Sequence, residues 1–385
     1  MKLEGVKVLD LTMFLPGPHL TMMMADHGAE VIRVEPPGGE PSREIGRRQG
    51  GTTVWFHNTH RNKQSIVLDL KRPAALEALL TLASRADVML ESFRPGAVDR
   101  LGIGYEAIRK RNPRIVYCSI SAFGQTGPNA MRVAHDLSIQ AESGTVGLNR
   151  GVDGRPVLPS VPVADMAGSL MALSGILMAL LRREKTGEGD CLDISMQDSL
   201  LAWTVNMVSP VFAEKRELDP STERSLGGAA FYNVYRCADG GELTLGGSEI
   251  KFAANLLGAL GRPDLVELCR LPPGRGQDPV RDFLRATFAT QPLAHWTAML
   301  SKLDVCWAPV KGYCEALQSE HLAAREMVLE FANGQTHLGM PIKFAREPGE
   351  IRPTAPQRGE HSKQVLKAAG LSDADIEAAL KVAQP

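Results

Sequence analysis

Three ionisable side chains lie in segments suited to acid–base or nucleophilic chemistry: His135, Asp165 and Glu249. His135 follows a glycine-containing loop at 123–128, Asp165 precedes a long apolar stretch, and Glu249 follows a Gly-Gly-Ser turn. Imidazole and carboxyl groups are the side chains that most often transfer protons in enzymes. A carboxylate also serves as a nucleophile in covalent catalysis.

Each of these residues also has a structural explanation. Asp165 is a candidate N-cap for the helix that follows it, because aspartate is favoured at that position. His135 is a candidate for a histidine satisfied inside the fold, and Glu249 for a solvent-exposed residue or another N-cap. Spacing within a single sequence does not choose between the chemical and the structural roles.

The elements that must position these residues begin with alternating strand and helix patterns over about the first 125 residues. We expect strands at 6–11, 30–35, 65–70, 87–91 and 115–120, and helices from the turn at 16–18 to Gly28, at 73–84 and at 105–111. This alternation predicts βαβ units and an α/β fold with a Rossmann-like parallel sheet. No G-x-G-x-x-G motif follows the first strand, so dinucleotide binding has no support.

The pattern changes after Phe231. A hairpin is expected from 231–237 and 242–246, followed by helices at 252–260 and 280–290, which together indicate a smaller α+β domain. Two amphipathic helical stretches between 362 and 381 could pack back on the sheet.

Composition excludes several classes of protein. The 385 residues are 44% hydrophobic and 23% charged with a net charge of −1, which argues against a disordered chain and against nucleic acid as a partner. Six scattered cysteines without a C-x-x-C pair argue against a disulfide framework or a zinc site. The apolar stretch 170–181 is too short to span a bilayer, and no signal peptide is visible. We therefore expect a cytoplasmic protein with no membrane partner.

Several segments, taken in order, resemble the family III CoA-transferases and the α-methylacyl-CoA racemases of the CaiB/BaiF superfamily, which share one fold. The matching segments are 3–10, 28–36, 62–71, 86–96, 123–128, 185–189, 235–240 and 355–362. Each is weak alone, but their common order covers nearly the whole chain.

This resemblance implies a Rossmann-like large domain made from both chain ends, with a smaller α+β domain inserted between them. The implied boundaries are 1–190 for the first part of the large domain, 191–225 for a linker, 226–325 for the small domain and 326–385 for the return to the large domain. It also implies a homodimer whose subunits interlock.

The resemblance further implies that coenzyme A is bound as part of the substrate, with no tightly bound cofactor and no metal. Positions that match its site are Arg33, Lys71, Phe93, Arg94 and Arg100. Their chemistry suits this role, because cationic groups pair with phosphates and Phe93 offers an apolar contact. The chain departs from the racemase pattern at residue 36, where a proline replaces a second basic residue.

The two branches of this superfamily use the Asp165 position differently. In the transferases it is the nucleophile that forms an aspartyl-CoA intermediate. In the racemases it forms an acid–base pair with a histidine on opposite faces of the α-carbon, supported by a glutamate at the Glu249 position. The sequence Ala134-His135-Asp136 is similar to the racemase Gly-His-Asp, which favours a racemase or epimerase of 2-methylacyl-CoA.

Other features keep alternatives open. The segment 140–144 is closer to a transferase Gln-Ala-x-Ser-Gly pattern, and Leu226 stands where an acidic residue is frequent. A family III CoA-transferase is therefore the main alternative. A non-enzymatic CoA-binding protein and a dehydratase or lyase are less favoured alternatives. We expect the acyl side chain to lie near Met131 and Ile139.

Overall fold

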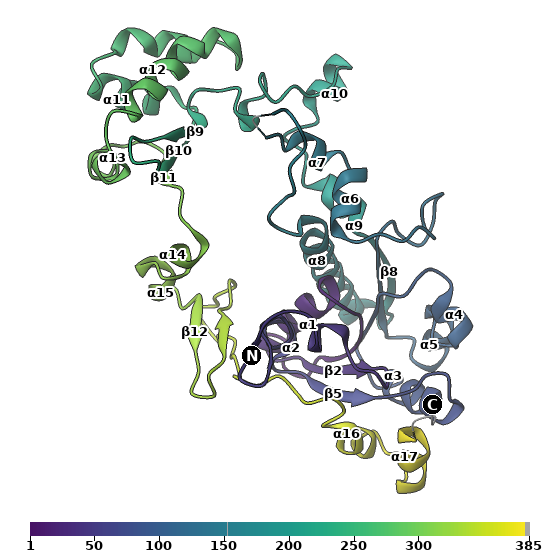
Figure 1. Ribbon diagram of the computed structural model, residues 1–385. Helices are drawn as coiled ribbons and strands as arrows, with labels where there is room; N and C mark the ends of the chain where they lie inside the picture. Colours follow the sequence, from purple (N-terminus) through teal and green to yellow (C-terminus); the bar gives the residue numbers. More distant parts are fainter. Residues whose placement is uncertain (152, 382–385) are drawn as a thin grey trace. The chain divides into compact units, whose positions relative to one another are not determined.

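The computed structural model describes residues 1–151 and 153–381, which divide into two compact units (Figure 1). Within the described residues, unit 1 comprises 1–151, 155–204 and 320–381, and unit 2 comprises 153–154 and 205–319. Unit 1 therefore contains segments from both ends of the chain.

Among the described residues, unit 1 is built on a six-stranded parallel sheet with the strand order β5-β2-β1-β6-β7-β8. The strands are β1 (Lys7–Leu11), β2 (Glu30–Glu35), β5 (Gln64–Val67), β6 (Val88–Glu91), β7 (Val116–Ser121) and β8 (Asp190–Ser195). The central strands are almost entirely buried and rich in valine, leucine and isoleucine, as expected for a parallel sheet covered on both faces.

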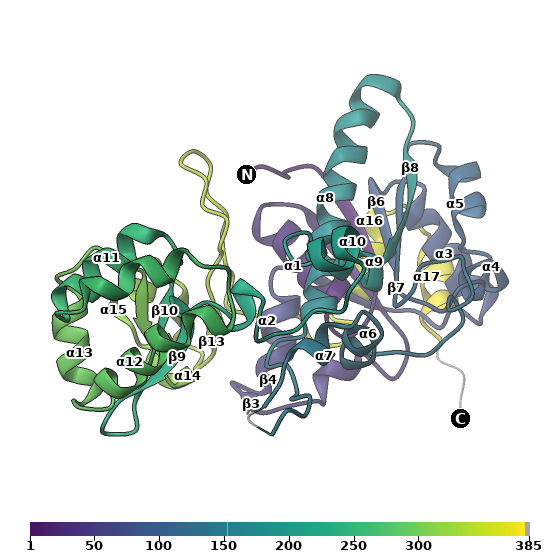
Figure 2. The same cartoon turned by 90° about the horizontal axis from the view of Figure 1, so that it is seen from above.

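Helices cover both faces of this sheet (Figures 1 and 2). Side chains alternate along the strands, so that Val8 and Val88 join one core cluster while Leu9 and Met89 join the other. The first cluster contains residues of α1 (Pro16–Asp26), α6 (Asp136–Glu142), α8 (Val163–Thr186) and α9 (Met196–Ala202). The second contains residues of α3 (Pro73–Ala83), α4 (Ala97–Leu101), α5 (Tyr105–Arg111), α16 (Ser362–Ala368) and α17 (Asp373–Leu380). The C-terminal helices thus pack against the sheet, as expected.

Short elements complete unit 1. They are α2 (Val54–His60), α7 (Thr145–Leu148), α15 (Glu320–Ala324), the short strands β3 (Arg48–Gln49) and β4 (Thr52–Thr53), and the hairpin of β12 (Val328–Glu330) and β13 (Thr336–Leu338).

The described part of unit 2 contains an antiparallel sheet in the order β11-β10-β9. Its strands are β9 (Tyr232–Arg236), β10 (Glu242–Gly246) and β11 (Trp307–Pro309), and its longer helices are α11 (Ile250–Ala259), α12 (Asp278–Phe288) and α13 (Leu293–Leu300). Shorter helices are α10 (Ser209–Glu214) and α14 (Tyr313–Leu317). The core joins strand residues such as Tyr235 and Leu243 to helix residues such as Leu256, Leu284 and Trp296.

The sheet of unit 1 extends beyond the expected boundary at residue 190. Residues 190–195 form β8, whose Ile194 pairs with Ile120 of β7, and α9 then packs on the same core. The segment expected as a linker from 191 therefore begins as part of the large sheet. The six cysteines, all in described segments, are free thiols.

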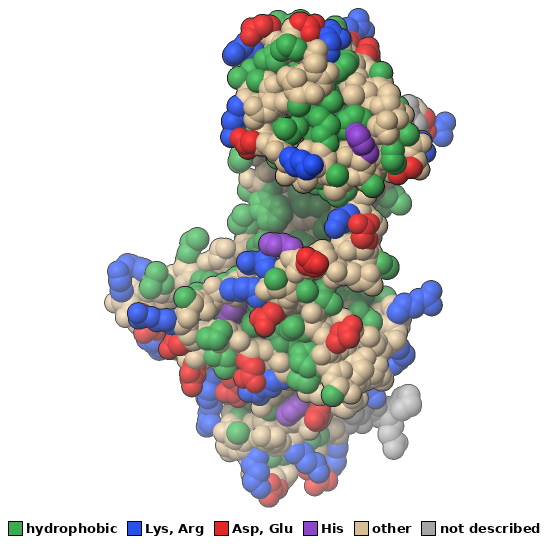
Figure 3. Space-filling model, turned by 90° about the vertical axis from the view of Figure 1, so that its left-hand side faces the viewer, with side chains coloured by type: hydrophobic (Ala, Val, Ile, Leu, Met, Phe, Trp, Pro, Cys, Tyr) green, Lys and Arg blue, Asp and Glu red, His purple; other side chains and the backbone are tan. Residues whose placement is uncertain are grey.

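Within residues 1–151 and 153–381, one helix, α8, is long and apolar enough to cross a membrane. The expectation that the apolar stretch 170–181 is too short to span a bilayer was wrong, because it is part of a longer helix. This helix has 24 residues and continues beyond 170–181 in both directions. Ala164, Ala172 and Ile176 of α8 are nevertheless buried against the sheet. On the face drawn in Figure 3, charged side chains of both signs are interspersed.

Candidate functional site

The carboxyl edge of the sheet contains a topological switch point between β1 and β6. The chain continues from β1 to β2 on one side, whereas β6 lies on the other side. In open α/β sheets, ligands bind outside the strand ends at such a point. The loop after β1 and the loop after β6 meet there, because the backbone N–H of Met13 donates a hydrogen bond to Ser92 Oγ at 3.1 Å.

Asp165 lies in the first turn of α8, where Asp136 holds the helix end. Asp136 Oδ1 accepts hydrogen bonds from the backbone N–H groups of Ala164 at 2.8 Å and Asp165 at 3.1 Å. The N-cap position itself is Pro162. The alternative role of Asp165 as an N-cap is therefore wrong, because Asp136 from α6 satisfies the N–H groups of this helix end.

The Asp165 carboxyl group is half-buried and has a strongly altered acidity. Burial, with the negative charge of Asp136 as a smaller cause, raises the pKa of Asp165 from 3.8 to about 7. Both protonation states are thus populated near neutral pH. This is the condition under which a carboxyl group both accepts and donates protons efficiently.

His135 is brought to the same place through its neighbour Asp136. It occupies the N-cap position of α6, is exposed, and precedes the aspartate that binds the Asp165 backbone. The Phe14 ring packs against its imidazole with centroids 5.6 Å apart and an interplanar angle of 88°. The structure therefore places the segment that carries His135 against the start of α8, which carries Asp165, and their joint catalytic role stays a prediction.

Gln140, the first residue of the transferase-like segment 140–144, has a structural role. Its side chain is 2% exposed, and Nε2 donates to Asp136 Oδ2 at 2.6 Å and to the carbonyl oxygen of Val161 at 3.2 Å. Gln140 thereby orients the carboxylate that holds α8. This role suits either branch of chemistry.

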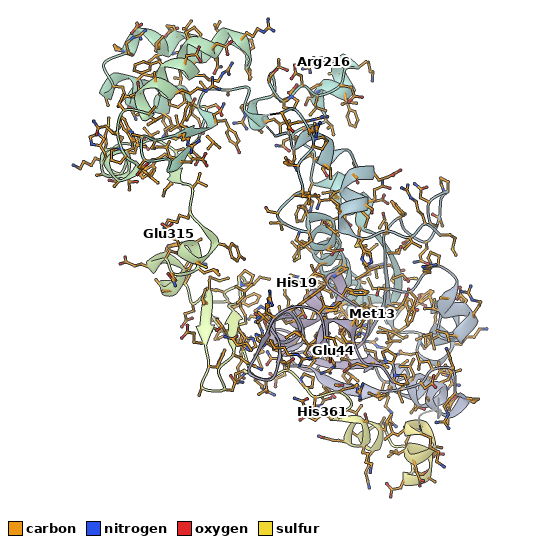
Figure 4. All side chains as sticks on the ribbon, viewed as in Figure 1. Met13, His19, Glu44, Arg216, Glu315 and His361 are labelled. Atoms are coloured by element: carbon orange, nitrogen blue, oxygen red, sulfur yellow. The ribbon has the colours of Figure 1, made fainter. Side chains whose placement is uncertain are left out.

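A second histidine lies one helical turn beyond Asp165. Ser169 is fully buried on the same side of α8, and its Oγ lies 2.9 Å from Nδ1 of His19. Burial, together with the positive charges of Lys63 and Arg61, lowers the pKa of His19 to about 4. His19 is consequently neutral at physiological pH. Figure 4 labels His19 and Met13 in unit 1.

Glu249, the third expected catalytic residue, belongs to unit 2. It occupies the N-cap position of α11 at the end of the β9–β10 hairpin and is exposed. Its role beside His135 and Asp165 stays a prediction.

The expected coenzyme A residues follow β5 and β6 at the carboxyl edge. Lys71, Arg94 and Arg100 are exposed, and Phe93 is partly buried against the core. The backbone N–H of Phe93 donates to Glu91 Oε2 at 2.7 Å, which fixes the start of this loop. Their role in binding phosphates stays a prediction.

Arg33 does not fit the expected phosphate site. Its side chain is 1% exposed, and its guanidinium pairs with the carboxylates of Asp10 and Glu40. A group enclosed in this way offers no surface to a nucleotide, so we remove Arg33 from the candidate set. Ile139 is fully buried in the core, and the expectation that the acyl chain lies near Met131 and Ile139 stays a prediction. Met131, at 60% exposure, is accessible.

The sequence did not single out Asp136, Phe14 or Glu40 as residues of the site. Asp136 directly follows a candidate histidine, and this proximity was the available signal. The contacts of Phe14 and Glu40 join segments far apart in the chain, so no local pattern indicates them. Within the described residues, no group of three or more His, Cys, Asp or Glu side chains is arranged to hold a metal ion.

The CoA-transferase family III matches residues 3–362 of this chain. The chain is 34% identical to acetyl-CoA:oxalate CoA-transferase of Acetobacter aceti, over 94% of this chain and 95% of that protein. It is 32% identical to human α-methylacyl-CoA racemase, over 98% and 95%. A CaiB/BaiF family protein from Brucella suis has a similar structure, with a TM-score of 0.82, 27% identity and coverage of 95% and 99%.

Proposed function

This chain belongs to CoA-transferase family III, whose members act on CoA thioesters, and from that premise we propose that it is an acyl-CoA racemase. In this proposal the enzyme inverts the α-carbon of a 2-methylacyl-CoA by transferring protons on two faces. The observation that carries the proposal is the Asp165 carboxyl, with a pKa of about 7, beside the segment that presents His135.

The proposed reaction begins with removal of the α-proton by one of the two residues. The electron pair moves into the thioester carbonyl and forms an enolate, whose negative charge oriented dipoles of the site would stabilise. The other residue then returns a proton to the opposite face of the carbon. A thioester suits this reaction because sulfur conjugates weakly with the carbonyl and leaves the α-proton comparatively acidic.

Coenzyme A would enter as part of the substrate and bind along the carboxyl edge of the sheet. Lys71, Arg94 and Arg100 would pair with its phosphates, and Phe93 would contact the adenine or the pantetheine arm. These residues lie after β5 and β6, on the same sheet edge as the loop of Met13. No tightly bound cofactor takes part in this proposal.

The proposed assembly is an interlocked homodimer. Supporting it, α8 exposes Met171, Leu177, Met178 and Leu181 at 37%, 40%, 69% and 70% of their surface. Such an apolar surface favours contact with another protein. Glu249, from the small domain expected at about 226–325, is the proposed supporting residue of the acid–base pair.

The alternative function is a family III CoA-transferase that moves CoA between carboxylic acids. The similarity to the Acetobacter aceti CoA-transferase favours this reading. Asp165 would then attack the thioester through a mixed anhydride and an aspartyl-CoA thioester, and His135 would not be required.

Epimerisation distinguishes the two functions. Each purified epimer of a 2-methylacyl-CoA is incubated with the enzyme without a carboxylic acid, and the products are separated by chiral chromatography. The racemase proposal predicts that both epimers converge on one mixture. Activity that appears only after a carboxylic acid is added, together with a hydroxamate formed on Asp165 when hydroxylamine displaces CoA from the aspartyl-CoA intermediate, would support the transferase.

A further inference from the structure

Phe14, whose ring packs against His135, has an unusual backbone conformation. Its φ angle is 66°, in the left-handed region that non-glycine residues rarely occupy. This conformation turns the chain sharply after β1. Since it is unfavourable for a residue with a side chain, neighbouring contacts must hold it.

Glu40 supplies such a contact from the loop after β2. Its Oε1 accepts a hydrogen bond from the backbone N–H of Phe14 at 2.9 Å, and the residue is 1% exposed. The same oxygen lies 3.2 Å from the hydroxyl of Ser42, while Oε2 pairs with Arg33. The carboxylate therefore uses both oxygens, one for the Phe14 turn and one for the guanidinium.

A buried network of charges fixes Glu40 in turn. Arg33 Nη1 donates to the carbonyl oxygen of Asp10 at 3.1 Å and to Asp10 Oδ1 at 3.3 Å. Lys63 Nζ lies 3.1 Å from Asp10 Oδ2. Neighbouring Lys63 and Arg33 hold the pKa of Asp10 far below its usual range despite burial, and burial lowers the pKa of Lys63 to about 8.

We propose that Glu40 is a positioning residue that places the Phe14 ring against His135 and so orients the imidazole for proton transfer. The path runs from the buried Asp10–Arg33 pair through Glu40 to the Phe14 backbone, and from the Phe14 ring to His135. Glu40 itself does not touch the imidazole. This inference rests on the proposed function only for its kinetic consequence, since the placement of the ring is independent of the reaction.

Glu40→Gln tests the path with a nearly isosteric change. A glutamine offers one oxygen, and the charged guanidinium of Arg33 competes for it more strongly than a backbone N–H does, so the N–H of Phe14 should lose its acceptor. Phe14→Leu removes the ring and leaves the buried network unchanged. Glu44→Gln is the matched control, because Glu44 lies four residues from Glu40 but is exposed and pairs with Arg48 (Figure 4).

The direct readout is the imidazole resonance of His135 in protein labelled with ¹³C-histidine, assigned with His135→Ala. Phe14→Leu should move this resonance by removing the ring current. Glu40→Gln should move it in the same direction, and Glu44→Gln should leave it in place. A resonance that moves in Phe14→Leu but stays unchanged in Glu40→Gln would overturn the proposal. Should Glu40→Gln fail to fold, Glu40→Asp gives the same test with the charge kept.

Kinetics supply the second readout, on the rate of α-proton exchange. Glu40→Gln and Phe14→Leu should each lower kcat by about 10- to 100-fold, with KM within about twofold, because they misplace a catalytic group without removing a binding contact. The double variant should be no slower than Phe14→Leu alone, since both changes act through one ring. Multiplying effects would contradict the proposed path. If the wild-type enzyme exchanges no proton, the proposed function fails, while the resonance still decides the positioning role.

Discussion

Asp136→Asn separates the two causes that raise the pKa of Asp165. The pKa rises from 3.8 to about 7, and burial is the larger cause while the Asp136 charge is the smaller. The charge therefore accounts for less than half of the rise. Removing it should lower the pKa of Asp165 but leave it above 3.8, because burial remains. A change of 1 in pKa corresponds to about 1.4 kcal/mol between the two protonation states.

The substitution preserves most of the local structure. The asparagine oxygen is still able to accept from the backbone N–H groups of Ala164 and Asp165, which Asp136 Oδ1 now binds. Its NH2 group would face Nε2 of Gln140, which now donates to Oδ2. Two opposed donors should destabilise the fold by about 1–3 kcal/mol, which thermal unfolding measures separately.

The assay is a carboxyl ¹³C titration of protein labelled at aspartate, with Asp165→Asn to assign the signal. The wild-type carboxyl should titrate near pH 7 and that of Asp136→Asn at lower pH. The acid limb of the kcat profile should shift in the same direction for the half-reaction in which Asp165 is the base. A folded Asp136→Asn protein with an unchanged Asp165 titration would refute the assigned role of Asp136.

Further predictions concern binding, stability and assembly. Arg94→Ala should weaken CoA binding by about 1.5–3 kcal/mol in calorimetry at fixed salt, whereas the control Arg109→Ala, on exposed α5 surface, should not; equal affinities would remove Arg94 from the site. The folded protein retains the Asp165 proton that the unfolded chain releases, so wild-type stability should fall as pH rises from about 4 to about 7. The Asp165→Asn protein has no carboxyl group here and should not lose this stability. The unfolding free energy of the variant minus that of the wild type should therefore rise by about 1–4 kcal/mol between about pH 4 and pH 7. A difference that does not change with pH would contradict the raised pKa of Asp165. Light scattering over a wide dilution series should show the constant mass of a dimer, because interlocked subunits do not separate without partial unfolding; a stable folded monomer would contradict the proposed assembly.

Much of the fold was predictable because its patterns are local. The strand patterns after Val6, Glu30, Asp87 and Ile115 correspond to β1, β2, β6 and β7 within one or two residues. The strand expected at 65–70 ends at Val67, because Asp69 turns the chain there: Arg72 N–H donates to its carbonyl oxygen at 2.9 Å. Hydrophobic alternation does not reveal such a turn.

The candidate site was predictable only in part. The residue types and the resemblance singled out His135 and Asp165, whereas Asp136, which joins them, acts through backbone groups in another helix. Arg33 illustrates the opposite error. The resemblance matched this position to a phosphate site, but the side chain is enclosed by Asp10 and Glu40, which only the folded chain brings near it.

Deuterium exchange tests the central claim most directly. A 2-methylacyl-CoA is incubated with the enzyme in D₂O without any carboxylic acid acceptor, and the mass of the acyl-CoA is followed over time. Two-base chemistry at His135 and Asp165 predicts a gain of one mass unit at the α-carbon, slowed about 10²- to 10⁴-fold by His135→Ala. No gain in mass across several branched acyl chains, with full activity once an acceptor acid is supplied, would contradict the racemase and establish the transferase in its place.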